Sequence, residues 1–165
     1  SDLKHLADSE NQPIIRVMPN INAQISQSTS AIVKNEFVDD SAYATVQEIF
    51  KSTGSVHEIA EKDFSTFAAI AGSSPAFIYM FIDAMARAGV LHGIPKDQAT
   101  AIVAETVRAS AEMILQSGEN PWSLVDKVSS PGGTTVAGVV SLEQNHFIGT
   151  VIDAISATIE KEKNL

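Results

Sequence analysis

The chain has 165 residues, of which 44% are hydrophobic and 19% are charged, and its formal net charge is −9. This size and composition favour a folded domain over a disordered chain. The acidic balance argues against nucleic-acid binding, which needs clustered Lys and Arg. The absence of cysteine excludes disulfides, thiolate nucleophiles and cysteine zinc sites. The four histidines, His5 among them, have no second ligand at a metal-binding spacing, so no metal site is expected.

The chain shows no targeting pattern. No uninterrupted apolar run is long enough to span a bilayer, and the segment Ser1-Asp2-Leu3-Lys4 has no signal-peptide pattern. We therefore expect a cytoplasmic protein without a membrane contact. The high apolar content predicts an interface with another subunit.

The first third of the chain predicts strands and one helix in the order β, β, α, β. The segments are residues 13–18, 30–33, 40–51 and 55–59. Asp39 and Asp40 provide an N-terminal cap for the helix, and Gly54 is predicted to provide its left-handed C-terminal cap. A parallel sheet needs partner strands, so this part is expected to be incomplete by itself.

From Glu61 onward, apolar residues recur at helical spacing. Ser73 and Ser74 before Pro75 predict the start of a helix that ends near residues 89–93. This helix is apolar on more than one face. It is therefore expected to be buried at the centre of a helical bundle or of a dimer.

Cap residues define the helices that follow. Pro95 begins a helix that ends at about Ser117, where Gly118 provides the C-terminal cap. Asn120 caps a short helix. Two further helices are predicted over residues 134–142 and 147–163.

The run SSPGGTT at residues 129–135 is the strongest candidate for a binding site. Pro131 lacks an N–H and suits the first turn of a helix, while Gly132 and Gly133 allow the backbone to approach a ligand closely. The N–H groups and the dipole at a helix N-terminus attract a small anion such as a carboxylate. The alternative is an ordinary capped turn, since Ser, Pro and Gly are common turn residues.

Four segments together resemble the pyrroline-5-carboxylate reductase family. They are RVMPN (16–20), GSSPAF (72–77), AGVLHGIP (88–95) and DKVSSPGGTTVAG (126–138). Their order and spacing are more specific than any one of them, and the resemblance spans essentially the whole chain.

The resemblance implies an α+β fold that is mainly α. Residues 1–60 would be the closing strands and helix of the NAD(P)-binding Rossmann domain. Residues 61–165 would be an all-helical dimerisation and substrate-binding domain, similar to the C-terminal domain of 6-phosphogluconate dehydrogenase. No G-x-G-x-x-G stands in these 165 residues, so the chain is expected to be a fragment that is inactive alone.

The reaction implied by the resemblance is the reduction of 1-pyrroline-5-carboxylate to L-proline with NADPH or NADH. The expected assembly is a homodimer, or a higher oligomer of dimers. Two alternatives remain open. One is a helical dimerisation module without catalytic activity, and the other is a small-anion or amino-acid-binding protein that keeps the SSPGGTT turn.

The resemblance also assigns substrate-binding residues. Backbone N–H groups would hold the substrate carboxylate, at Ser130, Gly133, Thr134 and Thr135. The Thr135 hydroxyl would face the imine nitrogen as the catalytic candidate, and we expect it to orient and stabilise rather than to act as a strong acid. Glu61 would lie near the substrate, with capping of a helix as the alternative.

Two residues are implied to contact the cofactor. Lys127 would contact the nucleotide, with a solvated side chain as the alternative. Asn20 would lie at the cofactor side of the sheet. The chain departs from the family pattern at Ile21-Asn22, where Thr-Pro is usual, and at Ser65 and Ala68, where many members have Asp and Thr.

Overall fold

The computed structural model describes residues 11–164; the predictions about Ser1–Lys4 and His5 lie outside them. The described residues form two compact units, one made of residues 11–75 and 154–164 and the other of Ala76–Asp153. The division differs from the expected domain boundary after residue 60. Because the units reflect packing within one copy of the chain, that boundary stays a prediction.

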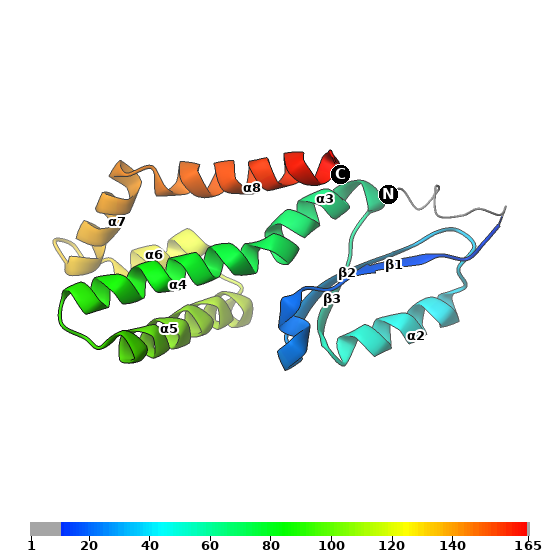
Figure 1. Cartoon of the computed structure of the whole chain (residues 1–165), viewed down its shortest axis with the longest axis horizontal. Coiled ribbons are helices and arrows are strands. Elements are labelled where there is room, and N and C mark those ends of the chain that lie inside the picture. Colours follow the sequence, from blue (N-terminus) through cyan, green and yellow to red (C-terminus); the bar gives the residue numbers. More distant parts are fainter. Residues whose placement is uncertain (1–10, 165) are drawn as a thin grey trace. The chain divides into compact units, whose positions relative to one another are not determined.

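The first unit contains a three-stranded sheet in the order β1-β2-β3 (Figure 1). Its strands are β1 (Ile15–Met18), β2 (Ser28–Lys34) and β3 (Gly54–Glu58). β1 runs antiparallel to β2, and β2 runs parallel to β3 after the crossover helix α2 (Asp40–Lys51). The predicted order β, β, α, β is confirmed, with the second strand beginning two residues earlier, at Ser28.

Both faces of the sheet are covered. On one face Ile32 is buried with Val38 and with Tyr43 of α2. On the other face its neighbour Ala31 is buried with two phenylalanines that follow Glu61 in the chain, Phe64 and Phe67. Alternate residues of β2 therefore serve two small cores, as expected for a strand buried on both sides.

Gly54 has a different role from the predicted one. Helix α2 ends with Ser52 as its C-cap residue, and Gly54 is the first residue of β3 with φ +146°. A Cβ atom on Gly54 would lie 2.1 Å from the carbonyl oxygen of Ser28. Glycine is therefore needed here for the close approach of two backbones.

A long helical segment runs from Glu61 to Leu91. It consists of the 3-10 turn η2 (Glu61–Asp63), helix α3 (Phe64–Phe67), the π-helical segment η3 (Ala68–Ser73) and helix α4 (Ser74–Leu91). α4 begins close to the predicted residue, but Pro75 does not open a separate helix. The chain is already helical before it, with a π-helical widening in place of a break.

This segment bears on two expectations. By length and mean hydropathy (1.4) it could cross a membrane, and 22% of the apolar window is buried within this chain. The residues Gly72-Ser73-Ser74-Pro75 interrupt the apolar run, and a helix covered by another subunit has the same composition, so this is weak evidence for a membrane span. Within this chain α4 does not lie at the centre of a bundle, since Met80 is 72% exposed; its burial in a dimer stays a prediction.

The helices of the second unit lie close to their predicted ranges, and α5 and the start of α6 have the predicted caps. They are α5 (Lys96–Ser117), α6 (Pro121–Val128), α7 (Thr134–Gln144) and α8 (Phe147–Lys163), whose last turns belong to the first unit. Pro95 is the N-cap of α5, Gly118 its left-handed C-cap, and the Asn120 side chain accepts a hydrogen bond from the N–H of Trp122 at 2.9 Å. The cap residues therefore determine where these helices begin and end.

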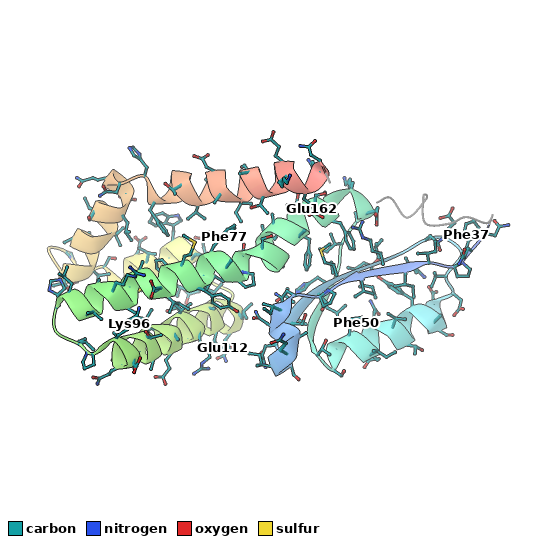
Figure 2. The ribbon with its side chains drawn as sticks, in the orientation of Figure 1. Phe37, Phe50, Phe77, Lys96, Glu112 and Glu162 are labelled. Carbon is teal, nitrogen blue, oxygen red and sulfur yellow. The ribbon has the colours of Figure 1, made fainter. Side chains whose placement is uncertain are left out.

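α4 and α5 are joined by an ion pair. Asp83 of α4 binds Lys96 at the start of α5, and it also binds Arg87 one turn later at 2.5 Å. Lys96 is labelled in Figure 2. Both cations stabilise the ionised form of Asp83 and hold its carboxyl pKa below the ordinary value of 3.8. This pair fixes the turn between the two helices.

Candidate functional site

The SSPGGTT run forms a tight turn between α6 and α7. The N–H of Gly133 donates to the carbonyl oxygen of Ser130 at 2.9 Å. Pro131 and Gly132 are the two central residues, and Gly132 has φ +70°. Proline followed by a residue with positive φ and closed by this hydrogen bond is a type II β-turn.

The N-terminus of α7 carries no side-chain cap. Gly133 is the N-cap residue, and no side chain accepts a hydrogen bond from the first turn. The first N–H groups of a helix have no partner within the helix. Thr134 and Thr135 are exposed, so their N–H groups are open to a ligand, and the helix dipole favours an anion at this point.

The turn already uses one of the predicted carboxylate donors, and the donor set stays a prediction. The N–H of Gly133 is already donated to Ser130, so it is not available to a substrate in this conformation. A Cβ atom on Gly133 would lie 2.4 Å from Ser130 Oγ, so glycine is needed for the turn itself. Beside the turn, Ser129 Oγ is buried without a hydrogen-bond partner.

Lys127 forms an ion pair that the sequence analysis missed. Its Nζ donates to both carboxylate oxygens of Glu119, at 2.7 and 2.5 Å. The pair joins the two ends of α6, since Glu119 precedes the helix and Lys127 lies in its last turn. The contact of Lys127 with a nucleotide stays a prediction, and it would have to compete with this pair.

Glu61 lies in the first unit and is paired with Arg16. Arg16 Nη1 lies 2.5 Å from Glu61 Oε1, and the guanidinium lies 4.3 Å from the ring centre of Phe64. The second carboxylate oxygen of Glu61 is buried without a hydrogen-bond partner. Arg16 belongs to the RVMPN segment. Its pairing with Glu61 could not be predicted from the sequence, because the two residues are 45 positions apart. The role of Glu61 toward a substrate stays a prediction.

Asn20 caps the 3-10 turn η1 (Ile21–Ile25) that follows β1. Its Oδ1 accepts a hydrogen bond from the N–H of Asn22 at 3.1 Å, and its Nδ2 donates to the carbonyl oxygen of Ala71 at 3.0 Å. The departures from the family pattern at Ile21 and Asn22 therefore fall in this turn. Contact of Asn20 with a cofactor stays a prediction.

Within residues 11–164, no three side chains of His, Cys, Asp or Glu are grouped to hold a metal ion. The candidate residues divide between the two units. Asn20 and Glu61 belong to the first unit, and the second unit holds Lys127, Ser130, Gly133, Thr134 and Thr135. In the second unit the turn residues come together at one helix N-terminus, which is a suitable place for a carboxylate.

Comparison with known proteins agrees with these features. The family described as pyrroline-5-carboxylate reductase dimerisation matches residues 61–165. A curated relative, the pyrroline-5-carboxylate reductase of Aquifex aeolicus, is 41% identical over 156 residues, which are 94% of this chain and 59% of the relative. The chain therefore spans little more than half the length of that relative.

Two solved structures share the fold of the chain. One is the 1-pyrroline-5-carboxylate reductase of Streptococcus pyogenes, with a TM-score of 0.93 and 48% identity, covering 99% of this chain and 64% of the other. The second is the pyrroline carboxylate reductase of Plasmodium falciparum with NADP bound, with a TM-score of 0.92, 34% identity and coverage of 99% and 66%. The expected combination of Rossmann-closing elements and a helical domain is confirmed.

Proposed function

This chain belongs to the pyrroline-5-carboxylate reductase family, and on that premise we propose that it is part of an enzyme that reduces 1-pyrroline-5-carboxylate to L-proline with NADPH or NADH. In this reaction a hydride adds to the C=N carbon, the double bond becomes a single bond, and the nitrogen takes up a proton. The chain contributes the site for the substrate carboxylate and the surface for a second copy. A cytoplasmic location is part of the same proposal.

The uncapped N-terminus of α7 is the observation that carries the proposal. The N–H groups of Thr134 and Thr135 and the positive end of the helix dipole favour a carboxylate beside the type II turn. Ser130 adds its hydroxyl and its backbone N–H as hydrogen-bond donors to the carboxylate at the same turn. The Thr135 hydroxyl would hold the imine nitrogen by a hydrogen bond, which orients the C=N group.

The described residues do not by themselves fit a dinucleotide. The chain has no G-x-G-x-x-G, Lys127 is paired with Glu119, and the side chain of Asn20 is engaged with the backbone on both sides. We therefore assign no step to these two residues. The main dinucleotide site would belong to the part of the enzyme that this chain does not span.

Replacing Thr135 by Ala in the complete gene product tests the role of the turn. We expect turnover of 1-pyrroline-5-carboxylate to fall by about tenfold to a hundredfold, because the variant loses a hydrogen bond that orients the reacting group. The dissociation constant for NADPH is expected to change by less than about twofold. Steady-state kinetics and a fluorescence titration with NADPH measure the two effects.

Thr100→Ala is the matched control, because the Thr100 hydroxyl bonds only to the carbonyl of Lys96 one turn earlier in α5. Its kinetics are expected to equal those of the unaltered protein. An unchanged turnover in Thr135→Ala would remove Thr135 from the mechanism. A complete gene product that forms dimers but oxidises no NADPH with this substrate would favour the dimerisation module.

The surface for a second copy lies on the second unit. A groove of about 790 Å³ is formed by α5, α6 and the residues between them, and it has mainly apolar walls. Its apolar lining includes Ala109, Met113, Ile114, Pro121, Leu124 and Val128. Met113 is 56% exposed, so a helix of a second copy would bury surface that water now covers, which favours association.

Met113→Glu tests this surface. A carboxylate in the groove would lose hydration when a second copy covers it, so we expect the dimer dissociation constant to rise by at least about tenfold. Gln116→Glu introduces the same charge on the same helix and is the control. Multi-angle light scattering over a dilution series measures the effect, and equal behaviour of the two variants would place the interface elsewhere.

A further inference from the structure

Asn20 connects three segments of the first unit that are distant in sequence. Its Oδ1 accepts hydrogen bonds from the N–H of Asn22 at 3.1 Å and, more weakly, from the N–H of Thr29 at 3.4 Å. Its Nδ2 donates to the carbonyl oxygen of Ala71 at 3.0 Å. One side chain thus holds the turn after β1, the start of β2 and the π-helical segment η3.

The partner in η3 lies four residues before a proline. In a regular α-helix the carbonyl of Ala71 would accept a hydrogen bond from the N–H of residue 75. Residue 75 is proline, which has no N–H. The side chain of Asn20 supplies a donor to this carbonyl. Two residues before Ala71, the carbonyl of Ala69 accepts a hydrogen bond from the Ser74 hydroxyl at 2.9 Å, so two carbonyls of η3 accept hydrogen bonds from side chains.

The other side of Asn20 is fixed by a buried polar pair. The backbone N–H of Asn20 donates to Ser28 Oγ at 3.2 Å, and Ser28 Oγ lies 3.0 Å from Ser30 Oγ. Ser28 and Ser30 are 2% and 0% exposed. Buried hydroxyls that satisfy one another specify a single arrangement. Asn20 is therefore held rigidly from the sheet side while its amide reaches the helix.

We propose that Asn20 is a positioning residue that fixes the end of β1 and the turn η1 to the helix at Ala71, in place of the hydrogen bond that Pro75 cannot donate. This role differs from direct binding of a cofactor. Both acceptor positions of Oδ1 and one N–H of Nδ2 are already used. A consequence for catalysis rests on the proposed reductase function, whereas the structural consequence does not.

Asn20→Asp tests the hydrogen bond to Ala71 separately from the hydrogen bond with Asn22. The aspartate keeps an acceptor for the N–H of Asn22 but has no donor for Ala71, where two oxygens would now face each other. Hydrogen exchange in the complete gene product is expected to become about fivefold faster or more in residues 68–78, with protection of η1 kept. Asn20→Ala is expected to lose protection in both segments.

Asn145→Asp is the matched control, because Asn145 Nδ2 also donates to a helical carbonyl, that of Ser141 at 2.8 Å, in the other unit. This change is expected to leave exchange in residues 68–78 unaltered. Unchanged exchange of that segment in Asn20→Asp would overturn the proposal.

Pro75→Ala provides the rescue, because it restores an N–H at position 75. In that background Asn20→Asp is expected to alter exchange in residues 68–78 by less than about twofold. Pro75→Ser restores the same N–H and serves if the alanine variant does not fold. An effect of Asn20→Asp that is equally large with and without Pro75 would overturn the proposal.

The NADPH dissociation constant distinguishes positioning from direct contact. For a positioning residue, Asn20→Asp weakens binding by about fivefold when Pro75 is present and by less than about twofold in the Pro75→Ala background. Equal weakening in both backgrounds would identify Asn20 as a direct ligand and overturn the proposal. Absence of NADPH binding in the unaltered protein would contradict the proposed reductase function, while hydrogen exchange would still decide the role of Asn20.

Discussion

The two compact units differ in how much of their apolar surface they bury. In the sheet unit, Ala31 and Ile32 are fully buried and Phe64 is 2% exposed, so both faces of the sheet have a core. In the helical unit, the buried apolar residues among those described are Ala86, Ala99 and Val103, which are small or medium in size. The sheet unit therefore has a buried core on each face of its sheet, whereas most of the large apolar side chains that are exposed belong to the helical unit.

The difference agrees with the proposal that a second copy covers the helical unit. Exposed apolar residues are spread over the helical unit, and Leu91, Leu115 and Val128 are 80%, 79% and 64% exposed. Exposed apolar residues of this size on a helical domain are consistent with a subunit interface. The family description as a dimerisation domain agrees with this distribution.

The largest expected effect that tests this comparison comes from Gly54→Val in the sheet unit. The new Cβ would meet the backbone of Ser28, and valine does not adopt φ +146° without strain. We expect a loss of more than about 4 kcal/mol in the free energy of unfolding. Urea unfolding with hydrogen exchange resolves which unit opens.

Gly138→Val in α7 is the control, because a Cβ there meets no atom within 4 Å. Its expected effect is less than about 1 kcal/mol. A much larger loss would mean that a second copy covers this face of α7 and would sharpen the contrast between the units.

An intermediate effect is expected for Phe64→Ala. The variant removes a side chain that is 2% exposed and that also supports the guanidinium of Arg16. The expected cost is about 3–5 kcal/mol, measured by urea unfolding. Leu115→Ser is the counterpart in the helical unit, and its monomer stability is expected to change by less than about 0.5 kcal/mol. Equal losses in the two variants would contradict the comparison.

The smallest effect is expected for Asp83→Asn, which removes the ion pairs with Lys96 and Arg87. Because the pKa of Asp83 is lower in the folded state than its ordinary value of 3.8, its contribution is fully present above that value. It is lost as the pH falls through the lowered pKa. The difference in Tm between the two proteins should therefore be small at pH 7 and vanish in strong acid. A constant difference would exclude the charge as its cause.

Local sequence signals were sufficient where a residue acts on its own neighbours. The caps at Pro95, Gly118 and Asn120 set the helix ends because each cap bonds to backbone within a few residues. The anion-binding potential of the SSPGGTT turn also depends on local backbone geometry, except that Gly133 donates inward to Ser130. That hydrogen bond closes the β-turn around Pro131-Gly132, and it was not predicted from the sequence.

Features that depend on distant residues could not be predicted. Pro75 suggested a helix start, but the helix continues because side chains compensate for its missing N–H, and Asn20 is 51 positions away from Ala71. The pairing of Arg16 with Glu61 crosses 45 positions. Gly54 was interpreted as a helix cap from its local sequence. Its role instead depends on the close approach of Ser28, which is a contact between two strands that local sequence does not reveal.

The open side of β3 has a practical consequence. In the described part of the chain, β3 pairs with β2 alone, so one row of its backbone N–H and C=O groups faces no strand. An unpaired strand edge is a template for strands of other molecules. A concentrated preparation of this chain would therefore tend to aggregate through backbone hydrogen bonds, and polar substitutions on the helical surface would not prevent it.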